Sequence, residues 1–450
     1  MVLVMPIEFP LGPRSGSELR RIYQKIFPFE EKGKLKPGDS LITLLASNSN
    51  YPNTIQTEAF MQASALGEGS PQIIQYSYSS TGMEGGDQGK MKLDFDRVSD
   101  INPFGLGAWI ANVLLHKYAS IYGADMVFMS LDHFTSPKCD KKDIPVLEDR
   151  ASFLKDKEGT PDYELARTQL INASRVLRPI IGDGAELSDD QLKTYIAYML
   201  SPQYRAYRND FISAVRYGRP AWAMMDTGNL PVVLNFATSR DLASRIRSGL
   251  NNLDVMIEAE IAATGQSGEE LRYTYWRDLS EDERAGEIAL VLAFVGYVGA
   301  DAISYEIGME HAAKAGVAHE PDKEKLMDIQ WALYERTGRH IPFAQHGGTG
   351  SSEILRGLVG KYNINTAYLH TGTTADASWV KEHQEGIKNR VKSAVGTGRD
   401  LYRVARVRET CLGYLEKTNS LNMAPLFREI LGTKKPSLGT YEGIKLESTE

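Results

Sequence analysis

Eight short apolar runs with strand character recur along this 450-residue chain, and segments with helical periodicity separate most of them. The strand-like runs are 41–47, 72–78, 125–131, 221–226, 254–260, 302–308, 340–345 and 362–368. The helical segments between them are 54–66, 112–122, 239–250, 281–298, 323–337 and 352–361. Strands that alternate with helices form parallel βαβ units, and eight such units close into a barrel. The sequence therefore predicts an α/β protein built as a (β/α)8 barrel.

One connection is much longer than a barrel requires. Residues of approximately 136–218, which follow the third predicted strand, contain helix-forming stretches at 160–177 and 188–211, whereas most connections span a few residues. We expect a helical insertion on the face where barrels carry active sites; it could serve as a lid, an oligomer contact or a decoration. A helical C-terminal extension is expected to complete a single domain of residues 1–431, followed by a mobile tail at 432–450.

Composition excludes several classes of partner. The net charge is −7, with acidic and basic residues interspersed, so no basic stripe is available for nucleic acid or an anionic membrane. No apolar stretch approaches the roughly 20 residues that a spanning helix needs. Two cysteines, Cys139 and Cys411, are too few for a disulfide framework, which favours a cytoplasmic location.

Three histidines lie just after predicted strands, and each has acidic or glycine-rich neighbours. They are His133, His311 and His346, after the third, sixth and seventh strands. The carboxyl ends of barrel strands meet on one face, so these residues are expected to converge there. Zinc accepts three imidazoles and leaves a fourth position open in catalytic sites. A divalent-metal site is therefore predicted, although any one of these histidines alone could be structural.

Carboxylates accompany the histidines. Asp132 could exchange protons with a metal-bound substrate, or it could cap the following loop. Asp226 and Glu260 end the fourth and fifth strands and could hold a second cation or orient the histidines. Glu269 and Glu270 end a glycine-containing stretch that could carry a carboxylate over the site, or form an ordinary exposed loop.

A glycine-rich run at 346–352 leads into the predicted helix at 352–361. The backbone N–H groups of Gly347, Gly348 and Thr349, together with a helix N-terminus, would provide a site for an anion. Asn363 and Thr366 end the eighth strand beside this run. Barrels commonly bind phosphate after strands seven and eight, so phosphate is the expected ligand.

These residues together resemble the class II, metal-dependent ketose-bisphosphate aldolases, and the match runs in order along most of the predicted barrel. Asp132-His133 looks like the family's Asp-His pair, and His311 and His346 match its other zinc ligands. Residues 257–260 resemble its E-x-E strand, and 269–270 resemble the acidic pair on its mobile loop. The resemblance implies one catalytic Zn²⁺ per chain, with a second divalent or monovalent cation near Asp226 and Glu260.

The resemblance also implies a set of contacts to substrate and phosphate. It comprises Ser77, Lys314, Gly347, Gly348, Thr349, Asn363, Asn365, Thr366 and Arg403. The chain departs from the family's pattern at three points. Asn365 stands in place of the usual aspartate, Ala312 follows His311 in place of glycine, and Lys314 comes one residue early. These departures affect the phosphate geometry and leave the identity of the sugar open.

The implied activity is that of a lyase which reversibly cleaves fructose 1,6-bisphosphate to dihydroxyacetone phosphate and glyceraldehyde 3-phosphate. Asp132 would handle the proton of the reacting hydroxyl, and Glu269 or Glu270 the proton at carbon. Tagatose 1,6-bisphosphate or another phosphorylated ketose is an alternative substrate, and cobalt, iron or manganese could replace zinc. A metal-dependent hydrolase and a non-catalytic paralogue are further alternatives. Relatives of this kind are commonly dimers or larger, so a homo-oligomer is expected.

Overall fold

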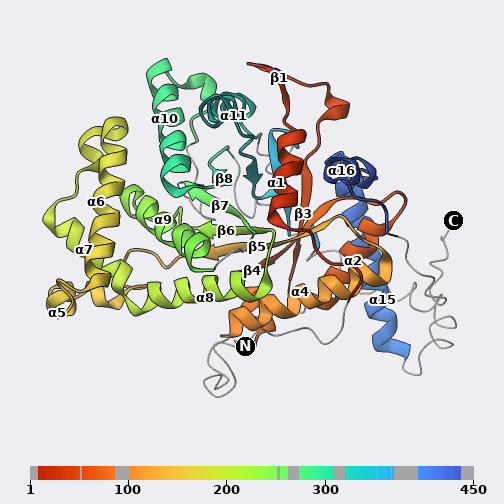
Figure 1. Ribbon diagram of the computed structural model, residues 1–450, viewed down its shortest axis with the longest axis horizontal. Helices are drawn as coiled ribbons and strands as arrows, with labels where there is room; N and C mark the ends of the chain where they lie inside the picture. Colours follow the sequence, from red (N-terminus) through yellow and green to blue (C-terminus); the bar gives the residue numbers. More distant parts are fainter. Residues whose placement is uncertain are drawn as a thin grey trace.

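The eight predicted strands form a closed parallel barrel at the centre of the protein (Figure 1). The computed structural model describes residues 9–50, 53–86, 102–250, 254–261, 273–308, 320–351, 353–365, 367–368 and 394–436. The barrel strands are β3 Leu44–Ser49, β4 Gln72–Ser77, β5 Val127–Thr135, β6 Trp222–Asp226, β7 Met256–Ile261, β8 Ala302–Tyr305, β9 Phe343–Gln345 and β10 Val359–Ile364. Each overlaps one predicted run, and β10 pairs with β3 to close the ring. The prediction of a (β/α)8 barrel is confirmed.

Helices surround the barrel, and a small antiparallel hairpin of β1 Phe29–Glu31 and β2 Lys34–Leu35 precedes it. The helices are α1 Gly16–Lys25, α2 Asn53–Ala65, α3 Tyr78–Glu84, α4 Pro103–Tyr122, α5 Arg150–Lys155, α6 Pro161–Ile181, α7 Asp189–Leu200, α8 Pro202–Gly218, α9 Val232–Gly249, α10 Glu281–Val298, α11 Lys323–Thr337, α15 Ala394–Lys417 and α16 Ala424–Leu431. Ser280 starts α10 with a capping box, which satisfies N–H groups that a helix start leaves unpaired. Among the described residues, no helix is long and apolar enough to cross a membrane.

One predicted helix, at 352–361, is wrong. Residues 353–358 are not helical, and β10 already begins at Val359. Gly357 has φ +77°, a left-handed conformation that a right-handed helix cannot contain. In the described residues, the connection from β9 to β10 therefore carries only the 3₁₀ turn Gly348–Gly350. A cavity of ≈ 590 Å³, lined in part by Thr349, Arg356 and Tyr362, lies beside this connection.

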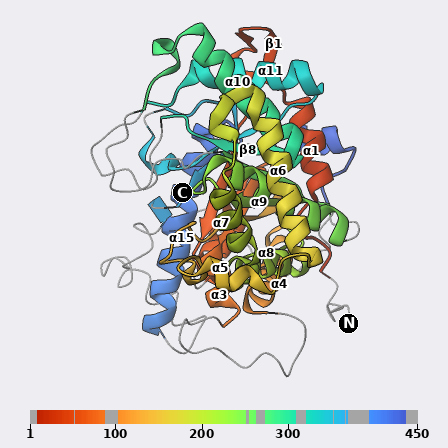
Figure 2. The same cartoon turned by 90° about the vertical axis from the view of Figure 1, so that its left-hand side faces the viewer.

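The long connection between β5 and β6 contains α5 to α8. Helix α8 contacts α4 and α9 and so takes the place of a barrel crossover helix. Helix α6 packs on α9 and α10, while α7 packs on α6 and α8. Figures 1 and 2 show these inserted helices on the flank of the barrel opposite to α15 and α16. Tyr198 and Tyr207, on α7 and α8, donate hydrogen bonds to the backbone carbonyls of Pro137 and Phe134, at the end of β5.

The amino ends of the strands are covered by α1 and α16, which contact each other. Leu19 and Tyr23 of α1 join a buried cluster with Phe128 and Trp222, which point into the barrel. The Tyr23 hydroxyl donates to the backbone carbonyl of Gly360, at the start of β10. This apolar layer closes one end of the barrel, so that polar side chains farther along the strands face only the other end.

A buried ion pair fastens α16 to this closed end. Arg428 donates to both carboxylate oxygens of Asp125, at 2.8 and 2.7 Å, just before β5. We expect Arg428→Leu to lower the free energy of unfolding by about 3 kcal/mol, because it leaves a buried carboxylate with a weaker partner. Urea unfolding followed by tryptophan fluorescence measures this change. The control Arg406→Leu removes an exposed pair with Glu409 and should cost less than about 0.5 kcal/mol. Equal losses of unfolding free energy in the two variants would contradict the role of the buried Arg428–Asp125 pair in holding α16.

Candidate active site

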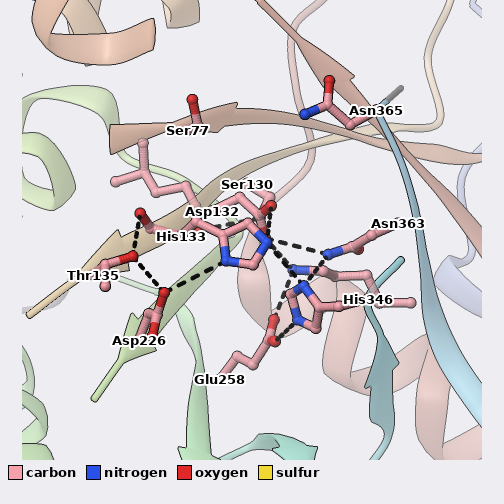
Figure 3. Close-up of polar contacts among 12 residues, drawn as sticks. Ser77, Ser130, Asp132, His133, Thr135, Asp226, Glu258, His346, Asn363 and Asn365 are labelled. Atoms are coloured by element: carbon pink, nitrogen blue, oxygen red, sulfur yellow. Dashed lines mark hydrogen bonds and ion pairs between the residues drawn. The ribbon is translucent and has the colours of Figure 1, made fainter. Parts of the chain in front are cut away.

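A β-bulge brings two consecutive residues of β5 into the same site. The register of β5 against β6 shifts between Leu131 and Phe134, and His133 has φ +48°, which is uncommon for a residue other than glycine. Consecutive strand residues normally point to opposite faces, but a bulge interrupts that alternation. Asp132 and His133 therefore both reach the carboxyl end of the barrel (Figure 3). The hydrogen bond from Tyr207 to the carbonyl of Phe134, 2.8 Å long, holds the residue that follows the bulge.

Two imidazole rings meet at the centre of the site, as Figure 3 shows. Nε2 of His133 lies 3.0 Å from Nδ1 of His346. The other ring nitrogen of each histidine faces a carboxylate. Nε2 of His346 is 3.0 Å from Oε1 of Glu258, and Nδ1 of His133 is 3.5 Å from Oδ2 of Asp226. Histidines that bind metals are typically oriented in this way, with a carboxylate on the nitrogen that does not ligate.

The geometry fits a divalent cation. Zinc–nitrogen bonds of 2.0–2.1 Å in a tetrahedral site separate two ligating nitrogens by about 3.3 Å, close to the distance between the His133 and His346 nitrogens. Asp132, His133 and His346 each offer a ligand atom, and these atoms lie within 4.8 Å of one another. Oδ2 of Asp132 is buried without a hydrogen-bond partner among the described residues. A cation or a substrate hydroxyl at this position would satisfy that oxygen.

A buried lysine forms ion pairs with two carboxylates of the site. Nζ of Lys361, on β10, lies 3.0 Å from Oδ1 of Asp132 and 2.7 Å from Oε2 of Glu258. All three side chains are at most 1% exposed. The indole N–H of Trp222 donates to the same Glu258 oxygen at 2.5 Å, and the Lys361 ammonium lies 5.3 Å from the centre of the Trp222 ring. Glu258 therefore links the lysine and the tryptophan to His346.

The charges in this cluster shift the ionisation of its members. Burial alone would raise the pKa of the Asp132 carboxyl, but Lys361 and the two histidines outweigh it and hold the pKa well below its ordinary value. Burial likewise opposes ionisation of Glu258, yet Lys361 and His346 lower its pKa. Burial lowers the pKa of His133, but Asp132 and Asp226 overcome this effect and raise it to about 9. Burial and the nearby His133 lower the pKa of His346. Binding of a cation between the two rings would therefore displace a proton.

Asp226 and Glu260 lie together at the ends of β6 and β7. Glu260 and Thr135 both hydrogen-bond to Asp226, whose pKa is lowered by His133 and these partners against the effect of burial. Since Asp226 contacts His133, its position agrees with an orienting role for this histidine. The alternative role, as a holder of a second cation, stays a prediction.

The glycine-rich run contacts the last strand closely. Gly347 has φ +68°, and a Cβ on Gly348 would lie 2.5 Å from the backbone oxygen of Asn363 and 2.9 Å from the Tyr362 ring. The Tyr362 hydroxyl donates to the carbonyl of Gly348 at 2.6 Å. Nδ2 of Asn363 lies 2.9 Å from Nδ1 of His346. The structure thus brings Gly347, Gly348 and Asn363 beside the candidate metal ligands.

Three other predicted contact residues have contacts elsewhere in the structure. The Ser77 hydroxyl caps α3 by accepting a hydrogen bond from the Ser80 amide. Oδ1 of Asn365 accepts from Asn50 at 2.9 Å, and Arg403 lies on α15, which packs against α2 and β3. Several predicted residues lie outside the described part of the chain, namely Glu269, Glu270, His311, Lys314 and Thr366.

Sequence reasoning missed the role of four residues, Asn48, Gln75, Glu258 and Lys361. The amide oxygens of Asn48 and Gln75 are buried without hydrogen-bond partners among the described residues, and these two residues are paired in register on β3 and β4. Strand alternation could have revealed the inward face, because Glu258 precedes Glu260 by two residues and Lys361 precedes Asn363 by two.

Comparison with known proteins shows the fold alone. Neither a family profile nor a curated protein matches the sequence. The crystal structure of fructose-bisphosphate aldolase from Campylobacter jejuni is similar to this chain, with a TM-score of 0.50 and 17% identity over 92% of this chain and 97% of that one. The YdjI aldolase from Escherichia coli K12 has a TM-score of 0.43 and 12% identity over 89% and 96% of the two chains. The likeness to the Campylobacter jejuni structure shows that this chain shares its (β/α)8 barrel fold.

The close contact at Gly348 leads to a prediction about stability. We expect Gly348→Ala to lower the free energy of unfolding by about 1–3 kcal/mol, because the added methyl group must displace Asn363 or Tyr362. Gly286→Ala, within α10, is the matched control, since a Cβ there meets nothing within 4 Å outside its own helix backbone. That control should stabilise the protein by up to about 1 kcal/mol through helix propensity. Urea unfolding compares the two, and a neutral Gly348→Ala would refute the close packing.

Proposed function

We propose that this protein is a metal-dependent aldolase that reversibly cleaves a ketose bisphosphate. The first candidate substrate is fructose 1,6-bisphosphate, which gives dihydroxyacetone phosphate and glyceraldehyde 3-phosphate. One observation carries the proposal. Two imidazole nitrogens converge at 3.0 Å, each ring is backed by a carboxylate, and the buried Asp132 lies beside them. The fold likeness to a fructose-bisphosphate aldolase supports this choice among metal-dependent reactions.

His133 and His346 would hold the metal ion, with His311 as the proposed third ligand. A bound divalent ion would supply Lewis-acid chemistry, which polarises the carbonyl group of a ketose. Zinc is the preferred candidate because imidazole nitrogens suit it, and cobalt, iron or manganese could substitute. Glu258 and Asp226 would keep the ligating nitrogens aimed at the ion, since each contacts the opposite nitrogen of one ring.

Asp132 would act as the base for carbon–carbon cleavage. Its Oδ1 is held by Lys361, while its Oδ2 has no hydrogen-bond partner among the described residues and lies 3.6 Å from Nε2 of His133. This oxygen would accept the proton of the hydroxyl whose carbon becomes the aldehyde, as the carbon–carbon bond breaks. Glu269 or Glu270 is proposed to return a proton to the other carbon.

Polar groups around the histidines would bind the rest of the substrate. The backbone amides of Gly347 and Gly348 are proposed to contact a phosphate, and Asn363 a substrate hydroxyl. The buried amide oxygens of Asn48 and Gln75 need donors, which the hydroxyl groups of a sugar phosphate would supply. The choice between fructose and tagatose 1,6-bisphosphate depends on contacts of this kind, so both belong in the test.

The test is cleavage of fructose 1,6-bisphosphate, measured as release of triose phosphate. Activity should be lost after chelation and restored by Zn²⁺ or Co²⁺. Asp132→Asn should lower kcat by a factor of about 10²–10⁴, because it removes the general base, while metal analysis should still detect bound ion. Asp190→Asn, on the exposed surface of α7, is the control and should keep normal activity. Near-normal turnover by Asp132→Asn would refute the role of Asp132. Bound metal without cleavage would redirect the test to tagatose 1,6-bisphosphate and other ketose phosphates.

A further inference from the structure

Lys361 places a buried positive charge next to the carboxylates that accompany the two histidines. Its ammonium contacts Asp132 and Glu258, and each of these carboxylates also contacts one of the two histidines. Lys361 is 0% exposed, so it cannot serve as a surface residue that exchanges partners with water. A buried ammonium of this kind is costly unless it is paired. The position of its ammonium therefore depends on both carboxylates.

Asp132 has two competing roles available. Its carboxylate lies close enough to His133 and His346 to complete a three-ligand set for a cation. A carboxylate that coordinates a divalent ion gives up much of its basicity, and so it is a poor acceptor for a substrate proton. The proposed reaction needs Asp132 as a base, so a neighbouring group must weaken the attraction between the Asp132 carboxylate and the ion.

We propose that Lys361 holds Asp132 out of the metal's ligand shell and reserves it for proton transfer. This inference rests on the proposed function, because it presumes a divalent ion between the histidines. The ammonium binds Oδ1 of Asp132 at 3.0 Å, so the carboxylate cannot turn both oxygens toward the ion. It also offsets the charge that would draw the ion to Asp132, and a single ammonium lowers the basicity of this carboxylate less than direct coordination by a divalent ion would.

The lysine itself is held in place. Oε2 of Glu258 lies 2.7 Å from Nζ of Lys361 and also accepts the Trp222 N–H. The other oxygen of Glu258 contacts His346 at 3.0 Å. Lys361 therefore cannot follow Asp132 toward the ion without giving up Glu258. Lys361 thus positions the proposed base, Asp132, directly and the candidate ligand His346 through Glu258.

The test measures Co²⁺ affinity and the Co²⁺ absorption spectrum, which reports coordination geometry. We expect Lys361→Met to bind Co²⁺ at least about tenfold more tightly, because Asp132 joins the ligands; changes near metal ligands commonly have effects of about 10–100-fold. The spectrum should change, and turnover should fall. In the double variant Lys361→Met with Asp132→Asn, the gain should disappear. A merely structural role for Lys361 predicts weaker binding instead, and this result would overturn the inference.

Two further variants keep the test decisive. Lys325→Met removes another buried lysine, which pairs with Glu287 at 3.2 Å away from the histidines, and it should leave Co²⁺ affinity unchanged. Asp132→Asn alone is close in shape to the native residue and tests the same idea if Lys361→Met does not fold. It should weaken Co²⁺ binding by less than about fivefold, whereas a loss of about 100-fold would make Asp132 a ligand in the native protein.

The native protein separates failure of this inference from failure of the proposed function. If the native protein binds no Co²⁺, the proposed function fails as well. If it binds Co²⁺ and cleaves substrate, only this inference is at stake.

Discussion

The ion pairs that Lys361 forms inside the barrel are the interaction on which the rest of the site depends. Desolvation of an ammonium and two carboxylates costs several kcal/mol per ion, and the cluster recovers this only through short, mutually fixed contacts. Those contacts give Glu258 one orientation, and Glu258 in turn orients His346. Trp222 completes the arrangement, because its ring fills the barrel below the lysine and its N–H binds Glu258. Packing at the closed end and chemistry at the open end are therefore physically connected.

The second half of the site depends on a local irregularity rather than on charge. His133 reaches His346 because the bulge in β5 breaks the alternation of side chains, and the left-handed conformation of His133 is the cost of that geometry. Tyr207 binds the next carbonyl from α8, at the end of the long β5–β6 connection. The inserted helices lead into a crossover helix that touches the backbone of the site. The β5–β6 connection is thus linked structurally to the site through Tyr207.

Much of the fold could be predicted, while part of the site could not. The eight strands and helices such as α10 and α11 follow from local periodicity, and His133, Asp132 and His346 follow from their positions at strand ends. Lys361 was missed for a specific reason. The sequence prediction placed it at the end of a helix at 352–361, whereas Gly357 breaks that helix and β10 begins at Val359. Asn48 and Gln75 were missed because polar residues inside strands carry no local sign of which partners they face.

Local periodicity alone determined the alternation of strands and helices, and with it the end of the strands at which the functional groups gather, because strand and helix periods depend only on near neighbours in the chain. Tertiary structure decided which side chains meet across the interior. Glu258 and Lys361 are 103 residues apart, and His133 and His346 are 213 residues apart. Their contacts depend on the register with which eight strands close and on one bulge in β5. Ring closure is a property of all the strands together, and no short stretch of sequence carries it.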